Sequence, residues 1–184
     1  MNTAFNYFSW LPLALADLFV TTLAIFIVPF VVPFAKNEHL PKYFRWLETY
    51  DNPITGEPSH WERWKWVRNL LGYKLGLYFQ TVGWLWRNKA YNYSYYVSGR
   101  EIYPEYKCYG NAHVGNNKNE TGFNLVLADN AWCLFALLPF FKIGKYQICW
   151  RIYLGWKIKS RSLSQNKSGR AMLAIFVGFR VEKF

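Results

Sequence analysis

The strongest constraint on this chain is an almost uncharged segment near its start. From Trp10 to Ala35 there are 26 residues with one ionisable side chain, Asp17, and no Lys or Arg. A membrane-spanning helix needs about 20 apolar residues, and this segment supplies them if Asp17 and the prolines are tolerated. Pro29 would kink or end such a helix. We therefore expect residues 1–36 to form a membrane anchor that spans, or that dips in and returns.

Two other interpretations of this segment stay open. A cleaved signal peptide is disfavoured, because no basic residue precedes the apolar run and no small-x-small pattern closes it. The second is a buried core helix. Asp17 lies close enough to the N-terminal end of the run to reach lipid headgroups or to be protonated. The three basic residues Lys36, Lys42 and Arg45 follow the run at once, so the positive-inside rule predicts a cytoplasmic C-terminal domain at the inner membrane.

The charge and aromatic content favour a lipid partner. The chain has a net charge of +11, and all 22 of its Lys and Arg follow the apolar segment. A basic protein binds nucleic acid or an anionic lipid surface. Ten Trp and fourteen Tyr favour the membrane, because these rings prefer the membrane–water interface. Three Cys without metal-ligand spacing indicate free thiols in a reducing compartment.

The middle of the chain predicts a linker and then a helix. Residues 37–58 are rich in turn-forming residues, and Ser59 with Glu62 forms a capping box. An amphipathic helix should occupy residues 59–88, lying at the interface or forming a re-entrant hairpin, because the charged Lys74 at its centre opposes a second crossing. Gly72 and Gly76 would permit close helix packing. The residues predicted at headgroup level are Trp61, Arg63, Trp64, Lys65, Trp66 and Arg68.

The C-terminal part, residues 89–184, alternates with period 2 and predicts an antiparallel meander of about five strands. Strands are expected at 91–97, 123–128, 132–140, 147–159 and 172–181. In the fourth of these, Trp150 and Trp156 should lie on the buried face. Arg151, Lys157 and Lys159 should form a basic, solvated face. The predicted fold class is therefore α+β: a membrane helix, a Trp-rich amphipathic helix and this sheet.

No catalytic, nucleotide-binding or metal motif is present, so we expect no cofactor and no metal site. One enzyme hypothesis joins Asp51, His60 and His113 at the bilayer, with a His as base and Asp51 orienting it towards a lipid headgroup. Nothing in the sequence brings the three together. An alternative function is nucleic-acid binding, although we favour lipid as the partner. The residues that would bind nucleic acid are Arg151, Lys157, Lys159, Arg161, Lys167 and Arg170.

Several strings in the chain resemble a family of uncharacterised, small membrane-associated proteins of tailed bacteriophages. They are residues 44–56 (FRWLETYDNPITG), 82–91 (VGWLWRNKAY), 154–157 (LGWK) and 169–176 (GRAMLAIF). The resemblance covers most of the chain and implies expression in a bacterial host. It carries no catalytic residue across.

From the residues and the resemblance together we expect a non-enzymatic protein at the inner face of the bacterial membrane. Its role would be interaction with the host envelope, resistance to a host defence, or a minor part of the virion. Its partners would be anionic lipids of the inner membrane and a host or phage membrane protein.

Overall fold

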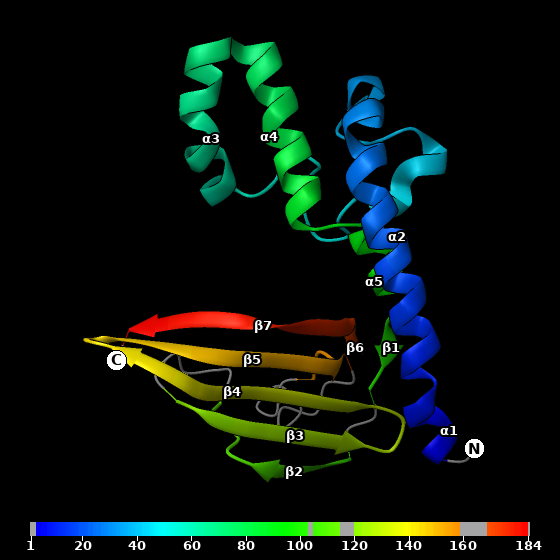
Figure 1. The fold of residues 1–184 in the computed structure, drawn as a ribbon. Helices are drawn as coiled ribbons and strands as arrows, with labels where there is room; N and C mark the ends of the chain where they lie inside the picture. The colour runs from blue at the N-terminus through cyan, green and yellow to red at the C-terminus, as the bar shows by residue number, and fades with distance from the viewer. Residues whose placement is uncertain (1–2, 103–104, 115–119, 159–168, 184) are drawn as a thin grey trace. The chain divides into compact units, whose positions relative to one another are not determined.

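The computed structural model of the chain describes residues 3–102, 105–114, 120–158 and 169–183 (Figure 1). It confirms the α+β class, with an apolar N-terminal helix, further helices and a five-stranded antiparallel sheet. The chain folds into two compact units. Unit 1 contains Met1–Ala14 and Ser98–Phe184, and unit 2 contains Leu15–Val97. The chain therefore leaves unit 1 after residue 14 and returns to it at residue 98.

Unit 1 is built on the predicted meander. The sheet order is β2-β3-β4-β5-β7, every neighbouring pair is antiparallel, and β1 pairs with β6 in a separate two-stranded sheet. The strands are β1 (Arg100–Glu101), β2 (Tyr106–Gly110), β3 (Gly122–Ala128), β4 (Trp132–Ile143), β5 (Tyr146–Trp156), β6 (Arg170–Ala171) and β7 (Leu173–Lys183).

The two faces of this sheet correct one prediction. The period-2 alternation in β5 is present, but the apolar face is largely exposed: Trp150 is 39% exposed, whereas its neighbour Cys149 is fully buried. Cys149 and Tyr153 lie on the opposite face, which is covered by Val114 from the loop after β2. Trp156, at the end of the strand, is buried as predicted. Alternation identifies which residues share a face but not which face another segment covers.

Helix α1 (Thr3–Phe8) and the start of α2 (Trp10–Val31) belong to unit 1. The Trp10 indole donates to the Gly155 carbonyl at 3.0 Å, and the Tyr7 hydroxyl donates to the Ala128 carbonyl at 2.8 Å. The Trp10 and Trp132 rings lie 5.2 Å apart. The first residues of the apolar segment are therefore fixed to the sheet by hydrogen bonds and ring contacts.

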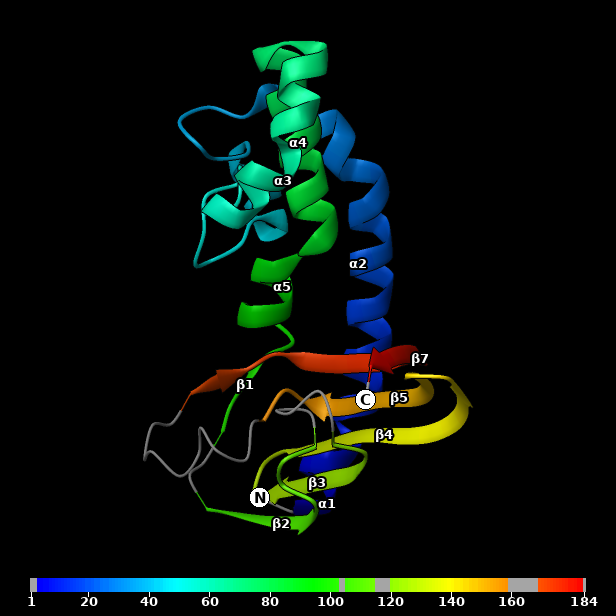
Figure 2. The same ribbon diagram turned by 90° about the vertical axis from the view of Figure 1, so that its left-hand side faces the viewer.

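Unit 2 is helical. It contains the rest of α2, the 3-10 helices η1 (Val32–Phe34) and η2 (Lys42–Leu47), and the helices α3 (Pro58–Leu71), α4 (Tyr73–Arg87) and α5 (Tyr91–Tyr96). Helices α4 and α5 run antiparallel to α2 (Figure 2). Tyr78 donates to the Pro29 carbonyl, Trp86 to the Ile25 carbonyl and Ser94 to Asp17. Buried residues from α2, η2, the following loop and α4 pack together and form the hydrophobic core of unit 2.

Three local predictions in this unit are wrong. The helix expected over residues 59–88 is two helices, because Gly72 adopts φ 80° and ψ 164° between them. The first of these begins at Pro58, and the Ser59 hydroxyl donates to the Glu57 carboxylate instead of capping the helix. The segment 91–97, predicted as a strand, is the short helix α5, where Tyr91 and Tyr95 stack on Tyr50 rather than alternate across a sheet.

Candidate functional site: the exposed face of α2 and the α3–α4 pocket

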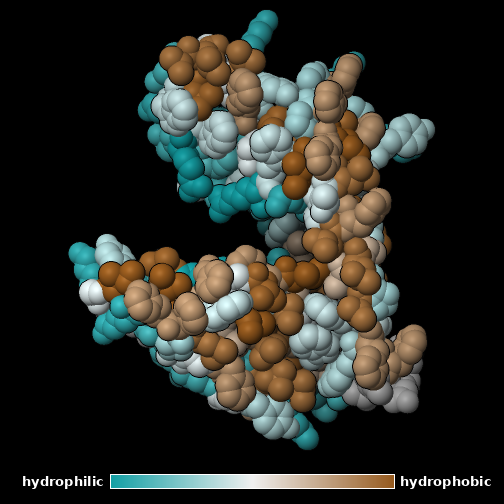
Figure 3. Space-filling view, viewed as in Figure 1, coloured by the Kyte–Doolittle hydropathy of each residue, from teal (hydrophilic) through white to brown (hydrophobic). Residues whose placement is uncertain are grey.

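The most prominent surface of unit 2 is one side of α2. Large apolar side chains follow one another along it at helical spacing, and none of them is charged. The surface, which we call the α2 face, consists of Leu15, Leu18, Phe19, Leu23, Phe26 and Phe30. Phe19, Phe26 and Phe30 are 69%, 65% and 75% exposed. Figure 3 shows hydrophobic side chains gathered along this helix. Exposed contiguous apolar surface of this kind marks a contact with lipid or protein.

The opposite side of α2 is occupied by unit 2. Ala24, Val28 and Val31 are buried in its core. Asp17, the single charge of the segment, is also on this side: it is 8% exposed and accepts a hydrogen bond of 2.7 Å from the Ser94 hydroxyl. The carboxylate therefore does not interrupt the α2 face.

By length and composition, one helical stretch among the described residues, Phe5–Phe34, is long and apolar enough to cross a membrane. The core helix of a soluble protein or a signal sequence meets the same criterion. What distinguishes this helix is that its large side chains point away from the unit that it packs on.

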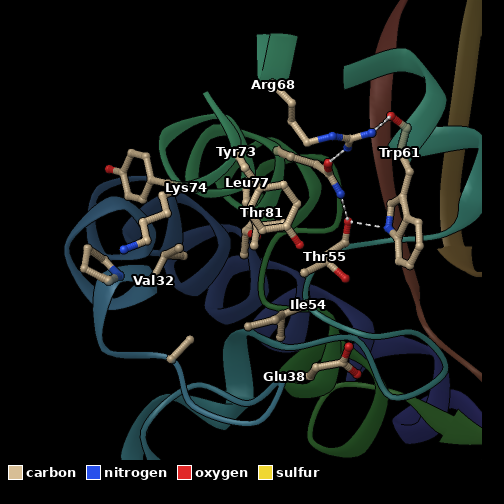
Figure 4. Close-up of a pocket in the computed structure, with 14 residues that line it drawn as sticks. Val32, Glu38, Ile54, Thr55, Trp61, Arg68, Tyr73, Lys74, Leu77 and Thr81 are labelled. Carbon is tan, nitrogen blue, oxygen red and sulfur yellow. Dashed lines mark hydrogen bonds between the residues drawn. The ribbon is translucent and has the colours of Figure 1, made fainter. Parts of the chain in front are cut away.

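A second feature of unit 2 is a pocket of about 570 Å³ between η1 with the residues after it, the loop after η2, α3 and α4 (Figure 4). Its apolar wall includes Val32, Pro33, Ile54, Leu77 and Tyr78. Its polar lining includes Glu38, Thr55, Arg68, Tyr73, Lys74 and Thr81.

A hydrogen-bond network fixes one side of this pocket. The Gln80 side chain is almost fully buried; its amide donates to the Thr55 carbonyl at 2.8 Å, and its oxygen accepts from Arg68. Arg68 also donates to the Trp61 carbonyl at 3.1 Å, and the Trp61 indole donates to the Thr55 carbonyl at 3.0 Å. The partner of Arg68 is thus a neutral amide, which leaves its positive charge without a carboxylate among the described residues.

The residues predicted at headgroup level have different environments. Trp66 is 65% exposed, while Trp64 packs against Gly83, where a Cβ would overlap its ring. Arg63 and Lys65 are exposed, and Lys65 lies 3.7 Å from Glu62. Trp61 and Arg68 belong to the pocket instead.

The two glycines predicted to allow close helix packing, Gly72 and Gly76, have different roles in the structure. Gly76 does allow close approach, because a Cβ there would overlap the backbone of Arg68. Gly72 is the break between α3 and α4, and a Cβ placed on it would meet nothing within 4 Å. The helix-packing prediction therefore fails for Gly72.

Two of the enzyme candidates, His60 and Asp51, lie in unit 2, and the third lies in unit 1. His60 is 2% exposed; its Nε2 donates to the Gln80 carbonyl at 2.9 Å, and its Nδ1 is buried without a partner. Burial lowers the pKa of His60 below its usual value, which makes it a neutral core residue. Asp51 is exposed in the loop before α3, and His113 belongs to unit 1. Among the described residues no three His, Cys, Asp or Glu side chains form a group suited to a metal ion.

The residues of the predicted basic face of the sheet also have different environments. The Arg151 guanidinium lies over the Phe176 ring at 4.9 Å and the Phe135 ring at 5.8 Å, so it packs among aromatics. Lys157 is exposed, and Arg170 donates to the Gly99 carbonyl at 2.9 Å. Lys159, Arg161 and Lys167 lie outside the described residues. The described members of the predicted basic set, Arg151, Lys157 and Arg170, therefore have different environments.

Sequence comparison gives a family but not an activity. The model of a family of unknown function, DUF7338, matches residues 1–182. The chain belongs to the DUF7338 family. No curated protein and no solved structure matches this DUF7338 protein, so its function must be argued from the two features above.

Sequence reasoning misses the residues that organise these features. The period-2 pattern places Ser94 in a strand, although it holds Asp17. The helical stripe places Gln80 on a flank of a continuous helix, although it links α3, α4 and the preceding loop. No local pattern marks either residue, because their partners, Asp17 for Ser94 and Arg68 and Thr55 for Gln80, become neighbours only in the folded chain.

Proposed function

We propose that this DUF7338 protein is a non-enzymatic, membrane-attached protein that binds the bilayer through the α2 face. The observation that carries the proposal is the row of exposed, uncharged Phe and Leu side chains on a helix whose other side is already packed. Burying an exposed side chain of this size in lipid contributes about 1.5–3 kcal/mol. Several such side chains in one row are enough for stable attachment.

The packing of unit 2 favours a helix lying in the plane of the membrane over one that crosses it. Helices α4 and α5 accompany α2 from Pro29 to Asp17. Trp86 contacts α2 at Ile25, between these two points, and Arg87 and Lys89 follow it. Both are exposed, and Arg87 pairs with Glu57 at 3.4 Å. If α2 crossed the bilayer with its partners in place, these cations would lie at mid-depth, where a charge is strongly unfavourable. An in-plane helix keeps them on the water side.

The fixed start of α2 constrains the topology further. Tyr7 and Trp10, which precede the α2 face, are hydrogen-bonded to the sheet. Residues 3–10 and the C-terminal sheet must therefore lie on the same side of any membrane. The sequence-based orientation, with a single crossing and only the C-terminal side in the cytoplasm, does not fit these contacts. We propose instead that both termini are cytoplasmic.

The cytoplasmic side is supported by charge and by thiols. Fifteen Lys and Arg lie from Arg87 onward, which suits the anionic cytoplasmic leaflet. Cys108, Cys133 and Cys149 are all free thiols, as expected in a reducing compartment. From the sequence resemblance alone we further propose that the membrane is a bacterial inner membrane during phage infection. There the protein would act on the host envelope, on a host defence or as a minor virion part.

The attachment is tested by replacing Phe19, Phe26 and Phe30 together with Gln. These three side chains are about two-thirds or more exposed, so their loss from lipid should cost roughly 4 kcal/mol, about a thousandfold in partitioning. The triple variant should fail to float with membranes on a density gradient while it stays folded.

A control replaces an exposed aromatic residue elsewhere in unit 2, Tyr43→Gln, which is 86% exposed. This variant should float as the wild type does. If the triple variant also floats, the α2 face is not the membrane contact.

A further inference from the structure

We propose that the α3–α4 pocket binds the phosphodiester headgroup of a phospholipid. This inference rests on the membrane attachment proposed above, and it specifies which lipid group unit 2 would bind there. The pocket volume of about 570 Å³ falls in the range of small-molecule sites and accommodates a headgroup with the first part of its acyl chains.

Two cations line the pocket without a carboxylate partner in the described part of the chain. Lys74, near the start of α4, makes no hydrogen bond or ion pair there. Arg68 is held by Gln80 and the Trp61 carbonyl, which fixes the guanidinium before any ligand arrives and still leaves donor groups free. Figure 4 shows the Lys74 ammonium and the Arg68 guanidinium on different sides of the pocket. Lys74, a point charge on a flexible stem, is therefore the cation that we assign to the phosphate.

The charge balance of the pocket selects among phosphates. Glu38 lines it as well, and Figure 4 shows Glu38 and Arg68 on different sides of the pocket. With Glu38, Arg68 and Lys74 the lining carries one net positive charge. This matches the single negative charge of a phosphodiester better than the multiple charges of a nucleotide or inorganic phosphate.

The apolar wall indicates that the phosphate belongs to a lipid. Val32 and Pro33 come from the segment that directly continues α2. Leu77 and Tyr78 face them from α4. A headgroup at Lys74 would thus have its acyl chains beside the end of the helix that contacts the bilayer.

The test uses the full chain purified in a phosphate-free nonionic detergent. Native mass spectrometry measures binding of phosphatidylglycerol, of diacylglycerol with the same acyl chains, and of soluble glycerol 3-phosphate. Phosphatidylglycerol should bind with clear preference over both others. Lys74→Gln should weaken that binding about tenfold, as expected for the loss of one charge-assisted contact at an open site. Lys89→Gln, which removes an equal charge outside the pocket, should change it less than about twofold, because an exposed charge away from the ligand contributes little.

Three results would overturn the inference. Equal binding of diacylglycerol would mean that phosphate is not recognised, and equal binding of glycerol 3-phosphate would remove the lipid assignment. Equal effects of Lys74→Gln and Lys89→Gln would mean that only overall charge matters. Thermal melting of both variants checks that they are folded. A separate result, failure of the wild-type protein to float with membranes, would reject the proposed membrane attachment instead.

Discussion

Replacing each of two tryptophans in β5 by Ala should have very different effects on unit 1. Trp156 is fully buried, and the Arg100 guanidinium lies over its ring at 4.4 Å. Trp150 is 39% exposed, and its closest ring contact is Phe179 at 4.4 Å between centroids. The two residues are six positions apart in one strand, and Gly155, with φ 98°, interrupts the alternation directly before Trp156.

The expected magnitudes follow from this burial. Truncating a buried Trp costs about 3–5 kcal/mol, a large part of a domain's net stability of about 5–15 kcal/mol. Trp150→Ala removes a half-open aromatic pair worth about 1 kcal/mol. For a unit of this size, a loss of about 1 kcal/mol shifts the melting temperature by about 4–8 °C. Trp156→Ala should therefore melt roughly 10–20 °C below Trp150→Ala.

Differential scanning calorimetry of the full chain in detergent measures the difference. If Trp150→Ala melts at or below the temperature of Trp156→Ala, the assignment of the exposed and buried parts of β5 is wrong.

Four further outcomes are expected. Ser94→Ala should lower stability by about 1–3 kcal/mol, because it leaves the buried Asp17 carboxylate without its hydroxyl partner; denaturant unfolding measures it, and no change would refute the contact. Gly76→Ala should cost about 1–3 kcal/mol by forcing α3 from α4, and a wild-type unfolding curve would refute the close packing. Maleimide should label only Cys108, which is exposed, because Cys133 and Cys149 are buried and the pKa of Cys133 is raised to about 11; mass spectrometry after labelling shows which thiols react. The lowered pKa of His60 means that below about pH 6.5 the unfolded chain takes up a proton that the folded chain does not, so stability falls as the pH is lowered there; a melting series should lose this slope in His60→Gln.

The sequence is sufficient where one local pattern dominates. The uncharged run from Trp10 to Ala35 correctly identifies α2, and the period-2 alternation over 147–159 identifies β5; β3, β4 and β7 are predicted from short apolar runs between turns. Both patterns repeat over many residues, so no single neighbour could reverse them.

The failures all depend on contacts between distant residues. The tyrosines of segment 91–97 alternate as in a strand, but stacking on Tyr50 favours a helix. Trp150 is exposed although the same alternation includes Trp156, because Trp156 is buried by residues from other segments, among them Ile102 and Leu173. The pocket is not predictable, since Gln80 and Thr55 meet only after α4 folds back on the loop before α3.

The central claim is that both ends of this membrane-attached protein lie on one side, because residues 7 and 10 bind the sheet. The most direct test fuses a fluorescent protein, and separately alkaline phosphatase, to each end of the chain in bacteria. Fluorescence without phosphatase activity at both ends, with the protein in the membrane fraction, is the predicted result. Phosphatase activity at the N-terminus with fluorescence at the C-terminus would establish a single crossing and contradict the account.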